Sequence, residues 1–284
     1  MQNDDQNNQI DNPKTFKDPT RLTNWLRGTW YTYIAGMSTL VCLSLLVLVC
    51  WMYMRQGGEF AQDSKIADLA NLCIDNEFLF FTLLGLFSWI PALLLLTWIH
   101  RANYNARHLG SRGMRFSPGW SVGWFFIPVL NIWKPYQVLK ELWKTSIDPQ
   151  YWKSQKGPSI LPWLWVLIFT SPLFYAAGSI TTNLAETLDG VIIGGWIKLI
   201  GYLMMLASPI LILTLIKSIY SRQMMHFAQG ARETEPEEEP QYTFKNPTRL
   251  TRWLTFFLYA NIALCVLTAL TLLLELDLLT NIQK

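Results

Sequence analysis

Lys198 is the charged residue whose surroundings most suggest chemistry, because it lies inside a long apolar run. A charged group at the centre of a bilayer costs about 2.5–3.5 kcal/mol on insertion scales. One interpretation is that its long side chain reaches back to the nearby outer end of the span. The other is that Lys198 lies on a pathway and handles an ion or a substrate. The sequence leaves both interpretations open.

Three prolines also lie inside apolar segments: Pro91, Pro172 and Pro209. Each removes a backbone donor and can kink its helix, and transporters expose backbone at such breaks. Proline is equally common in spans that have no transport role.

The sequence contains none of the motifs GxSxG, HExxH, GxxxxGK[ST] or GxGxxG, and its three His are not grouped as metal ligands. It therefore predicts a protein that is not an enzyme and needs no cofactor or metal.

The segment 112–143, RGMRFSPGWSVGWFFIPVLNIWKPYQVLKELW, is rich in Trp, Pro and basic residues. Its apolar run has about 11 residues, or roughly 16 Å as a helix, whereas a bilayer core needs about 20 residues. A new helix is expected to start at Pro135, with one aromatic-apolar face and one basic face. The pattern predicts a re-entrant segment followed by an amphipathic interfacial helix over 119–147. The alternative is an ordinary cytoplasmic loop packed on its own bundle.

This segment and the basic run before it supply the candidate contacts with lipid or a partner. Bases near a membrane surface attract anionic headgroups by about 1 kcal/mol each, and Trp suits the headgroup level. Asn131 either satisfies a backbone break left by Pro128 or Pro135, or contacts a ligand. The candidates are Arg107, Arg112, Arg115, Trp120, Trp124, Asn131, Trp133, Lys134, Tyr136, Lys140, Trp143 and Lys144.

The stretch SRGMRFSPGWSVGWFFIPVLNIWKPYQVLKELW (111–143), preceded by HRANYNARHLG (100–110), resembles the bacterial membrane family catalogued as domain of unknown function 4328. Members of that family carry a similar Arg-rich lead, a PGW-xx-GW-FIP-xx-N-x-W-P-Y core and a following E-x-W. The resemblance extends roughly from Leu83 to Arg222. It implies a multi-pass bacterial membrane protein without an assigned activity, and it supplies no catalytic residues.

The composition is that of a membrane protein, with half of the 284 residues apolar and 15% charged. Soluble domains average about 25% charged residues. The apolar runs predict an all-α integral membrane protein with about five transmembrane helices, near 30–54, 78–99, 160–180, 191–216 and 253–274. The net charge of +3 is too small to indicate nucleic acid. The four Cys lack CxxC spacing, so no metal or redox motif is expected.

A short motif occurs twice: TFKDPTRLTNWL at 15–26 and TFKNPTRLTRWL at 243–254 agree at 10 of 12 positions. This agreement indicates duplication of a module that starts a helix, in which Asp18 caps a helix beginning at Pro19. The module is either a bare cap at a membrane span or a docking element for a partner.

The expected domains are a disordered tail at 1–15, a membrane domain at 16–227, an acidic linker at 228–243 and, at 244–284, the second copy with the fifth span.

Basic residues predict the topology. Residues 101–156 contain nine Lys or Arg against two acidic residues, so the positive-inside rule places this stretch in the cytoplasm. The loops at 55–77 and 182–190, which carry an excess of acidic residues, are then outside. The N-terminus is cytoplasmic and the C-terminus is outside, in a bacterial inner membrane.

Two functions follow from these patterns. The first is a non-enzymatic scaffold of the inner membrane, in which 112–143 organises anionic lipid headgroups, a protein partner or a homo-oligomer. The second is a small-molecule or ion transporter or channel that uses the proline-kinked helices, with Lys198 and Asn131 near the pathway. An intramembrane enzyme would need convergent His, Ser, Asp or Glu side chains inside the spans, which the sequence lacks.

Overall fold

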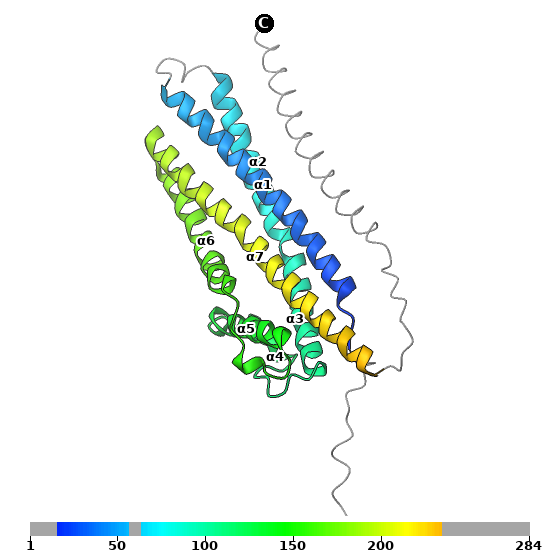
Figure 1. Cartoon of the computed structure of the whole chain (residues 1–284). Coiled ribbons are helices and arrows are strands. Elements are labelled where there is room, and N and C mark those ends of the chain that lie inside the picture. The colour runs from blue at the N-terminus through cyan, green and yellow to red at the C-terminus, as the bar shows by residue number, and fades with distance from the viewer. Residues whose placement is uncertain (1–15, 57–63, 235–284) are drawn as a thin grey trace, which may run out of the picture. The chain divides into compact units, whose positions relative to one another are not determined.

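The structure, a computed structural model, describes residues 16–56 and 64–234. Within these ranges the regular structure is entirely helical (Figure 1). The helices are α1 (Thr20–Gln56), α2 (Ser64–Phe87), α3 (Trp89–His108), α4 (Trp120–Gly123), α5 (Lys134–Ile147), α6 (Ile160–Leu184) and α7 (Leu188–Thr234), with 3-10 turns at Trp124–Phe126, Leu130–Ile132 and Trp152–Ser154.

Four helical stretches of the described chain are long and apolar enough to cross a membrane. They are Thr20–Met52, Leu79–His108, Ile160–Leu184 and Leu188–Gly230. The expectation of an all-helical chain with several such helices is therefore confirmed for the described residues. The fifth expected span, like the tail at 1–15 and the second motif copy, lies outside them.

The described residues divide into two compact units. Unit 1 comprises residues 16–27, 92–163 and 211–234, and unit 2 comprises 28–56, 64–91 and 164–210. Helices α1, α3, α6 and α7 each run from one unit into the other.

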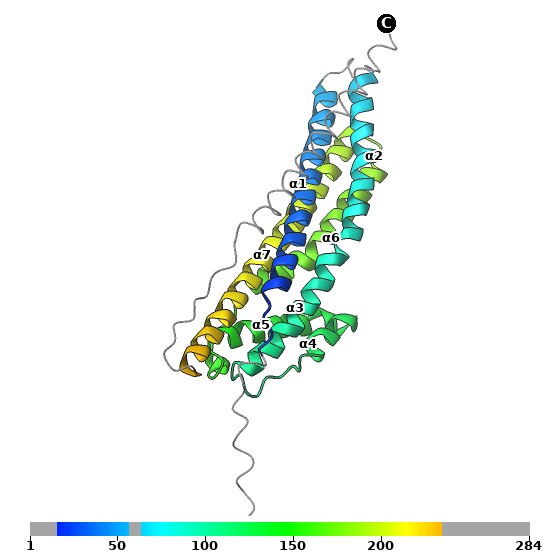
Figure 2. The same ribbon diagram turned by 90° about the vertical axis from the view of Figure 1, so that its right-hand side faces the viewer.

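Unit 2 is a bundle of α1, α2, α6 and α7 (Figures 1 and 2). Met37 and Leu40 of α1 pack with Leu84 of α2 and Tyr202 of α7 in one buried cluster, and Tyr175 of α6 lies against it. A second cluster joins α1 to α7 through apolar residues spaced one or two helical turns apart on each helix: Val47, Leu48 and Trp51 of α1 and Ile192 and Leu199 of α7. The helical spacing of these residues explains why each helix buries one face.

Glycines let the backbones of α6 and α7 touch. A Cβ atom added to Gly194 would lie 2.6 Å from the Thr182 nitrogen, and one added to Gly201 would lie 2.7 Å from the Tyr175 nitrogen. A Cβ atom on Gly178 would overlap the backbone of Lys198. Small residues at a membrane helix contact allow this close approach, and the contact fixes the position of the Lys198 backbone.

Unit 1 is held together by polar contacts between the ends of the long helices. The start of α1 joins α3, because the Trp98 indole donates to the Thr23 hydroxyl at 3.0 Å. The Gln223 amide of α7 donates to the Ala102 carbonyl of α3 at 2.9 Å. Helix α5 buries Val138, Leu139 and Leu142, and these contacts together surround the segment 112–143 with fixed neighbours.

The expected cap of α1 is confirmed. The Asp18 carboxylate accepts a hydrogen bond from the Thr20 backbone N–H at 2.9 Å. The Thr23 N–H donates to the Pro19 carbonyl at 2.8 Å, so helical bonding begins at Pro19. A carboxylate at this position satisfies one of the free N–H groups at a helix start.

Other expected boundaries differ from the structure. The loop at 55–77 is mostly helical, because α1 ends at Gln56 and α2 begins at Ser64. A turn at Ser88 interrupts the helix within the second membrane-length stretch, Leu79–His108, and Pro91 lies in the first turn of α3. The reason is that Pro91 has no N–H to donate to Phe87, four residues earlier. Helix α7 continues to Thr234, into the region expected to be linker.

The segment 119–147 is not one continuous helix. It consists of the short α4, two 3-10 turns and then α5. Pro128 interrupts the apolar run, and α5 has proline in its first turn, as expected from the sequence. Only α5 is a helix of several turns, which agrees with the amphipathic pattern that begins at Lys134.

Candidate functional site

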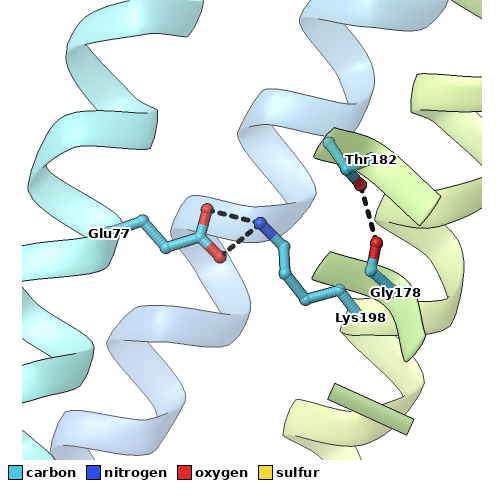
Figure 3. Close-up of polar contacts among 4 residues, drawn as sticks. All are labelled: Glu77, Gly178, Thr182 and Lys198. Carbon is cyan, nitrogen blue, oxygen red and sulfur yellow. Dashed lines mark hydrogen bonds and ion pairs between the residues drawn. The ribbon is translucent and has the colours of Figure 1, made fainter. Parts of the chain in front are cut away.

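Lys198 forms a buried ion pair with Glu77 in unit 2 (Figure 3). The Lys198 Nζ lies 3.0 Å from Glu77 Oε1 and donates a hydrogen bond to Oε2 at 3.2 Å. The two side chains are 13% and 4% exposed. Both oxygens of the Glu77 carboxylate therefore lie next to the ammonium, and the Tyr202 hydroxyl also makes a hydrogen bond with Glu77.

Three helices position this pair. Glu77 comes from α2 and Lys198 from α7, at the point where Gly178 of α6 touches the Lys198 backbone. The Thr182 hydroxyl turns back to the Gly178 carbonyl at 2.9 Å, within α6 (Figure 3). One turn further along α7, Tyr202 lies within electrostatic range of Glu77. The ion pair therefore joins α2 to the contact between α6 and α7.

The Lys198 side chain is directed to Glu77 of α2. Arg55 and Asp189 form an ion pair at 2.8 Å, and their side chains are both 61% exposed. Lys198 follows Asp189 by nine residues, which is about 13 Å along a helix. Half of a hydrocarbon core is about 15 Å. The pairing with Glu77 favours a role for Lys198 inside the bundle over a side chain that reaches back to the end of the span.

Glu77 is a functional candidate that the sequence analysis missed. It was assigned to an external loop because it follows several other acidic residues. Its burial shows that the bundle begins earlier than the apolar run. A usable signal was a carboxylate directly before one span and a lysine inside another, since buried charges in membranes are almost always paired.

Hydrogen bonds of the buried Glu141 and of the Phe116 backbone hold the segment 112–143 in its conformation and tie it to α3. The Glu141 carboxylate accepts hydrogen bonds from the backbone N–H groups of Arg115, at 3.2 Å, and Phe116, at 3.3 Å. The Phe116 carbonyl accepts from the Asn103 amide at 3.1 Å and from the Arg107 guanidinium at 2.7 Å. Burial raises the pKa of Glu141, although these N–H groups and the nearby charges of Arg107 and Arg115 oppose the shift.

Five large apolar side chains of this segment are exposed. They are between 42% and 68% accessible within the described structure, and we call them the apolar surface of 120–133: Trp120, Phe126, Val129, Ile132 and Trp133. The Trp120 ring lies against the Trp124 ring, with centroids 4.8 Å apart. Exposed apolar residues gathered in one short stretch mark a contact with lipid or protein.

The candidate bases divide into exposed and engaged groups. Arg112, Arg115 and Lys140 are exposed. The Lys134 ammonium lies 5.1 Å from the centroid of the Trp124 ring, and Lys144 donates to the Lys153 carbonyl at 3.3 Å. Cation–π contacts of this kind leave the ammonium accessible to other partners, whereas the Arg107 guanidinium is directed to the Phe116 carbonyl.

The remaining candidates of the segment have mixed surroundings. The side chain of Asn131 is exposed, and the backbone near Pro128 is bonded through the Asn131 N–H to the Ile127 carbonyl at 2.8 Å. The Trp143 ring lies 4.2 Å from the Arg222 guanidinium of α7. Tyr136 is half-buried. Asn131 belongs to unit 1 and Lys198 to unit 2.

Among the residues that the structure describes, no group of three or more His, Cys, Asp or Glu could hold a metal ion. The polar groups that the bundle gathers in unit 2 are instead a lysine, a glutamate and tyrosines. Such a set binds through charge and hydrogen bonds.

Helices long enough to cross a membrane, a buried ion pair in one unit and an exposed aromatic segment in the other define a multi-helix membrane protein. Residues 77–221, just over half of the chain, match the family described as Domain of unknown function (DUF4328). The chain belongs to this family, which confirms the resemblance carried by the Trp- and Pro-rich stretch. Comparisons with curated proteins and with solved structures found no match.

Proposed function

We propose that this protein is a non-enzymatic, multi-pass protein of the bacterial inner membrane whose segment 112–144 binds the anionic surface of the cytoplasmic leaflet. It acts there as a scaffold that organises lipid. The N-terminus is cytoplasmic and the C-terminus is outside. A protein partner and a homo-oligomer are the alternative occupants of the same surface.

The apolar surface of 120–133 is the observation that carries this proposal. Its five side chains lie in a stretch too short to cross a bilayer and remain exposed in the folded chain. Aromatic and branched side chains that enter the boundary between headgroups and acyl chains gain about 25 cal/mol for each Å² of apolar surface removed from water. The segment therefore either lies in the interface or dips into the lipid as a re-entrant turn.

Charge supports lipid as the occupant. Arg112, Arg115 and Lys140 are exposed on the same segment or beside it. Each base near an anionic membrane surface contributes about 1 kcal/mol. Trp at the headgroup level adds an amphipathic anchor. Apolar side chains flanked by bases are the combination found in segments that lie on membranes.

Spin labels placed on the full-length chain in nanodiscs test the depth of this surface. We expect labels at Phe126 and Val129 to collide more with oxygen, which dissolves in lipid, than with a water-soluble nickel complex. A label at the exposed Gln150, in the same unit, should show the reverse ratio. Labels at Phe126 and Val129 that are as water-accessible as the one at Gln150 would contradict lipid insertion.

The charge contribution is tested with nanodiscs that contain phosphatidylglycerol. The double substitution Arg112→Glu and Lys140→Glu should reduce the phosphatidylglycerol that copurifies with the protein, because it replaces attraction with repulsion. Arg55→Gln, at an exposed base of the other unit, is the matched control. If anionic lipid is unchanged but the oligomeric state falls, the surface contacts another copy of the chain.

Transport of a small molecule or ion is a second candidate function, favoured by the buried Glu77–Lys198 pair. Ionisable residues inside membrane bundles commonly mark ion and substrate sites. This candidate involves different residues from the lipid contact, so the two are tested separately.

A further inference from the structure

Stabilisation of the folded bundle is not a sufficient reason for the ion pair of Glu77 and Lys198. Removing two charges from water costs several kcal/mol for each ion, and well-packed apolar residues often stabilise a core as well as a buried pair does. Unit 2 already has two apolar clusters that join its helices. An ion pair buried in such a bundle therefore calls for a functional explanation.

We propose that Glu77 and Lys198 form a binding site for a small monovalent anion, which replaces Glu77 at the Lys198 ammonium while Glu77 takes up one proton. In the empty state the carboxylate neutralises the ammonium. In the occupied state the bound anion neutralises it, and Glu77 is an uncharged carboxylic acid. The proton adds to a carboxylate oxygen, and the ammonium keeps all three of its protons.

Charge neutrality explains why the proton and the anion enter together. An anion added to the intact pair would leave a net negative charge in a region of low dielectric constant, and such a charge is strongly unfavourable. One proton on Glu77 removes that charge. Lys198 is the one cation that the described side chains place against Glu77, so a monovalent anion matches this charge and a divalent anion does not.

Two details of the site favour an anion over a cation. Lys198 is the more exposed partner, at 13% against 4%, and an ammonium has three donors, of which Glu77 accepts one hydrogen bond. A cation bound at Glu77 would require Lys198 to lose its proton for neutrality to hold.

Among the side chains that the structure describes, tyrosines are the other titratable groups recorded near the pair. Tyr202 of α7 lies close enough to interact electrostatically with both Glu77 and Tyr175 of α6. Tyr33 of α1 packs against the apolar cluster that contains Tyr202. Their hydroxyl groups can donate hydrogen bonds to a bound anion. Tyrosine is uncharged at neutral pH, so the charge balance of the site depends on Glu77 and Lys198.

The experiment measures chloride binding to the full-length protein in nanodiscs made of uncharged lipid, with the thermal unfolding temperature as the readout. Coupling of one proton to one anion requires the chloride affinity to rise about tenfold for each unit by which the pH falls. Proton uptake on chloride addition is measured in parallel with a pH indicator in weak buffer. Sulfate should bind more weakly than chloride.

Substitutions separate the two roles. Glu77→Gln should bind chloride with an affinity that no longer depends on pH and without proton uptake, since the amide is already neutral. Lys198→Met should abolish binding. The pair of substitutions Arg55→Gln and Asp189→Asn removes the exposed ion pair of the same unit and should leave the pH-dependent binding unchanged.

Infrared difference spectra of the unsubstituted protein keep the test decisive if a variant unfolds. Chloride should produce the carbonyl band of a protonated carboxyl group. Absence of chloride binding and of this band would overturn the proposal, as would pH-independent binding by the unsubstituted protein or stabilisation by sodium instead of chloride. The inference gives the second candidate function a substrate class, and it does not rest on the lipid contact of 112–144.

Discussion

Glu77 and Lys198 neutralise each other in one ion pair, so the effect of substituting one of them on the unfolding free energy depends on whether the other is still charged. Both side chains are nearly buried. Loss of one charge leaves the other unpaired in a region of low dielectric constant, which typically costs about 3–5 kcal/mol. Loss of both charges leaves a neutral pair and costs less. The effects of the two substitutions are therefore not additive.

We expect Glu77→Gln and Lys198→Met to lower the unfolding free energy by about 3 kcal/mol each, because each leaves a buried charge. The double variant should lose clearly less than the sum of the two. Denaturant titration of the protein in detergent micelles measures all three values. Arg55→Gln, at an ion pair whose partners are 61% exposed, should change the free energy by less than about 1 kcal/mol. Additive losses would show that the pair does not couple the two helices.

At the scale of elements, the contact between α6 and α7 determines where the ion pair lies. Gly178 lies against the Lys198 backbone, and Gly194 lies against Thr182. Because the helices touch through backbone atoms, no side chain can yield to make room there. The break at Ser88, before Pro91, separately ends α2 after it has placed Glu77 in the bundle.

Substitution of the glycines tests this contact. We expect Gly178→Ala to lower the unfolding free energy by about 1–3 kcal/mol, the usual range for overpacking, because its Cβ atom meets the backbone of α7. Gly85→Ala is the matched control in the same unit, since a Cβ atom there meets nothing within 4 Å. It should be neutral or slightly stabilising, because alanine favours helix. Equal effects at the two positions would exclude close packing as the cause.

At the scale of the whole molecule, the distribution of bases predicts which ends of the helices face the cytoplasm. The bases of unit 1 contrast with Glu186, before α7, and Asp189, in its first turn. The positive-inside rule follows from the difficulty of moving Lys and Arg across the membrane during insertion. The lipid-contact proposal depends on this orientation, because the surface charge of the cytoplasmic leaflet is negative.

Labelling of single cysteines in intact cells tests the orientation. In a background without the native cysteines, a thiol reagent that cannot cross membranes should modify Glu186→Cys but not Lys153→Cys. Both positions are exposed in the structure, so accessibility in the folded chain is matched. Modification of position 153 or 144 from outside would reverse the topology and remove the basis for a cytoplasmic lipid contact.

The sequence by itself determined the features that depend on neighbours along the chain. Apolar runs predicted the four described membrane-length helices, Asp18 and Pro19 predicted the start of α1, and the Trp- and Pro-rich stretch predicted the family. Each signal is local, because helical periodicity, capping and proline geometry act over a few residues.

Only the tertiary structure decided which charged groups meet and which side chains remain exposed. Glu77 and Lys198 are 121 positions apart in the chain, and no local pattern joins them. The tertiary structure likewise directs Arg107 to the Phe116 carbonyl while it leaves Arg112 exposed, although both belong to one basic run. The physical reason is that ion pairing and burial depend on distances between elements, and these are set by how the helices pack.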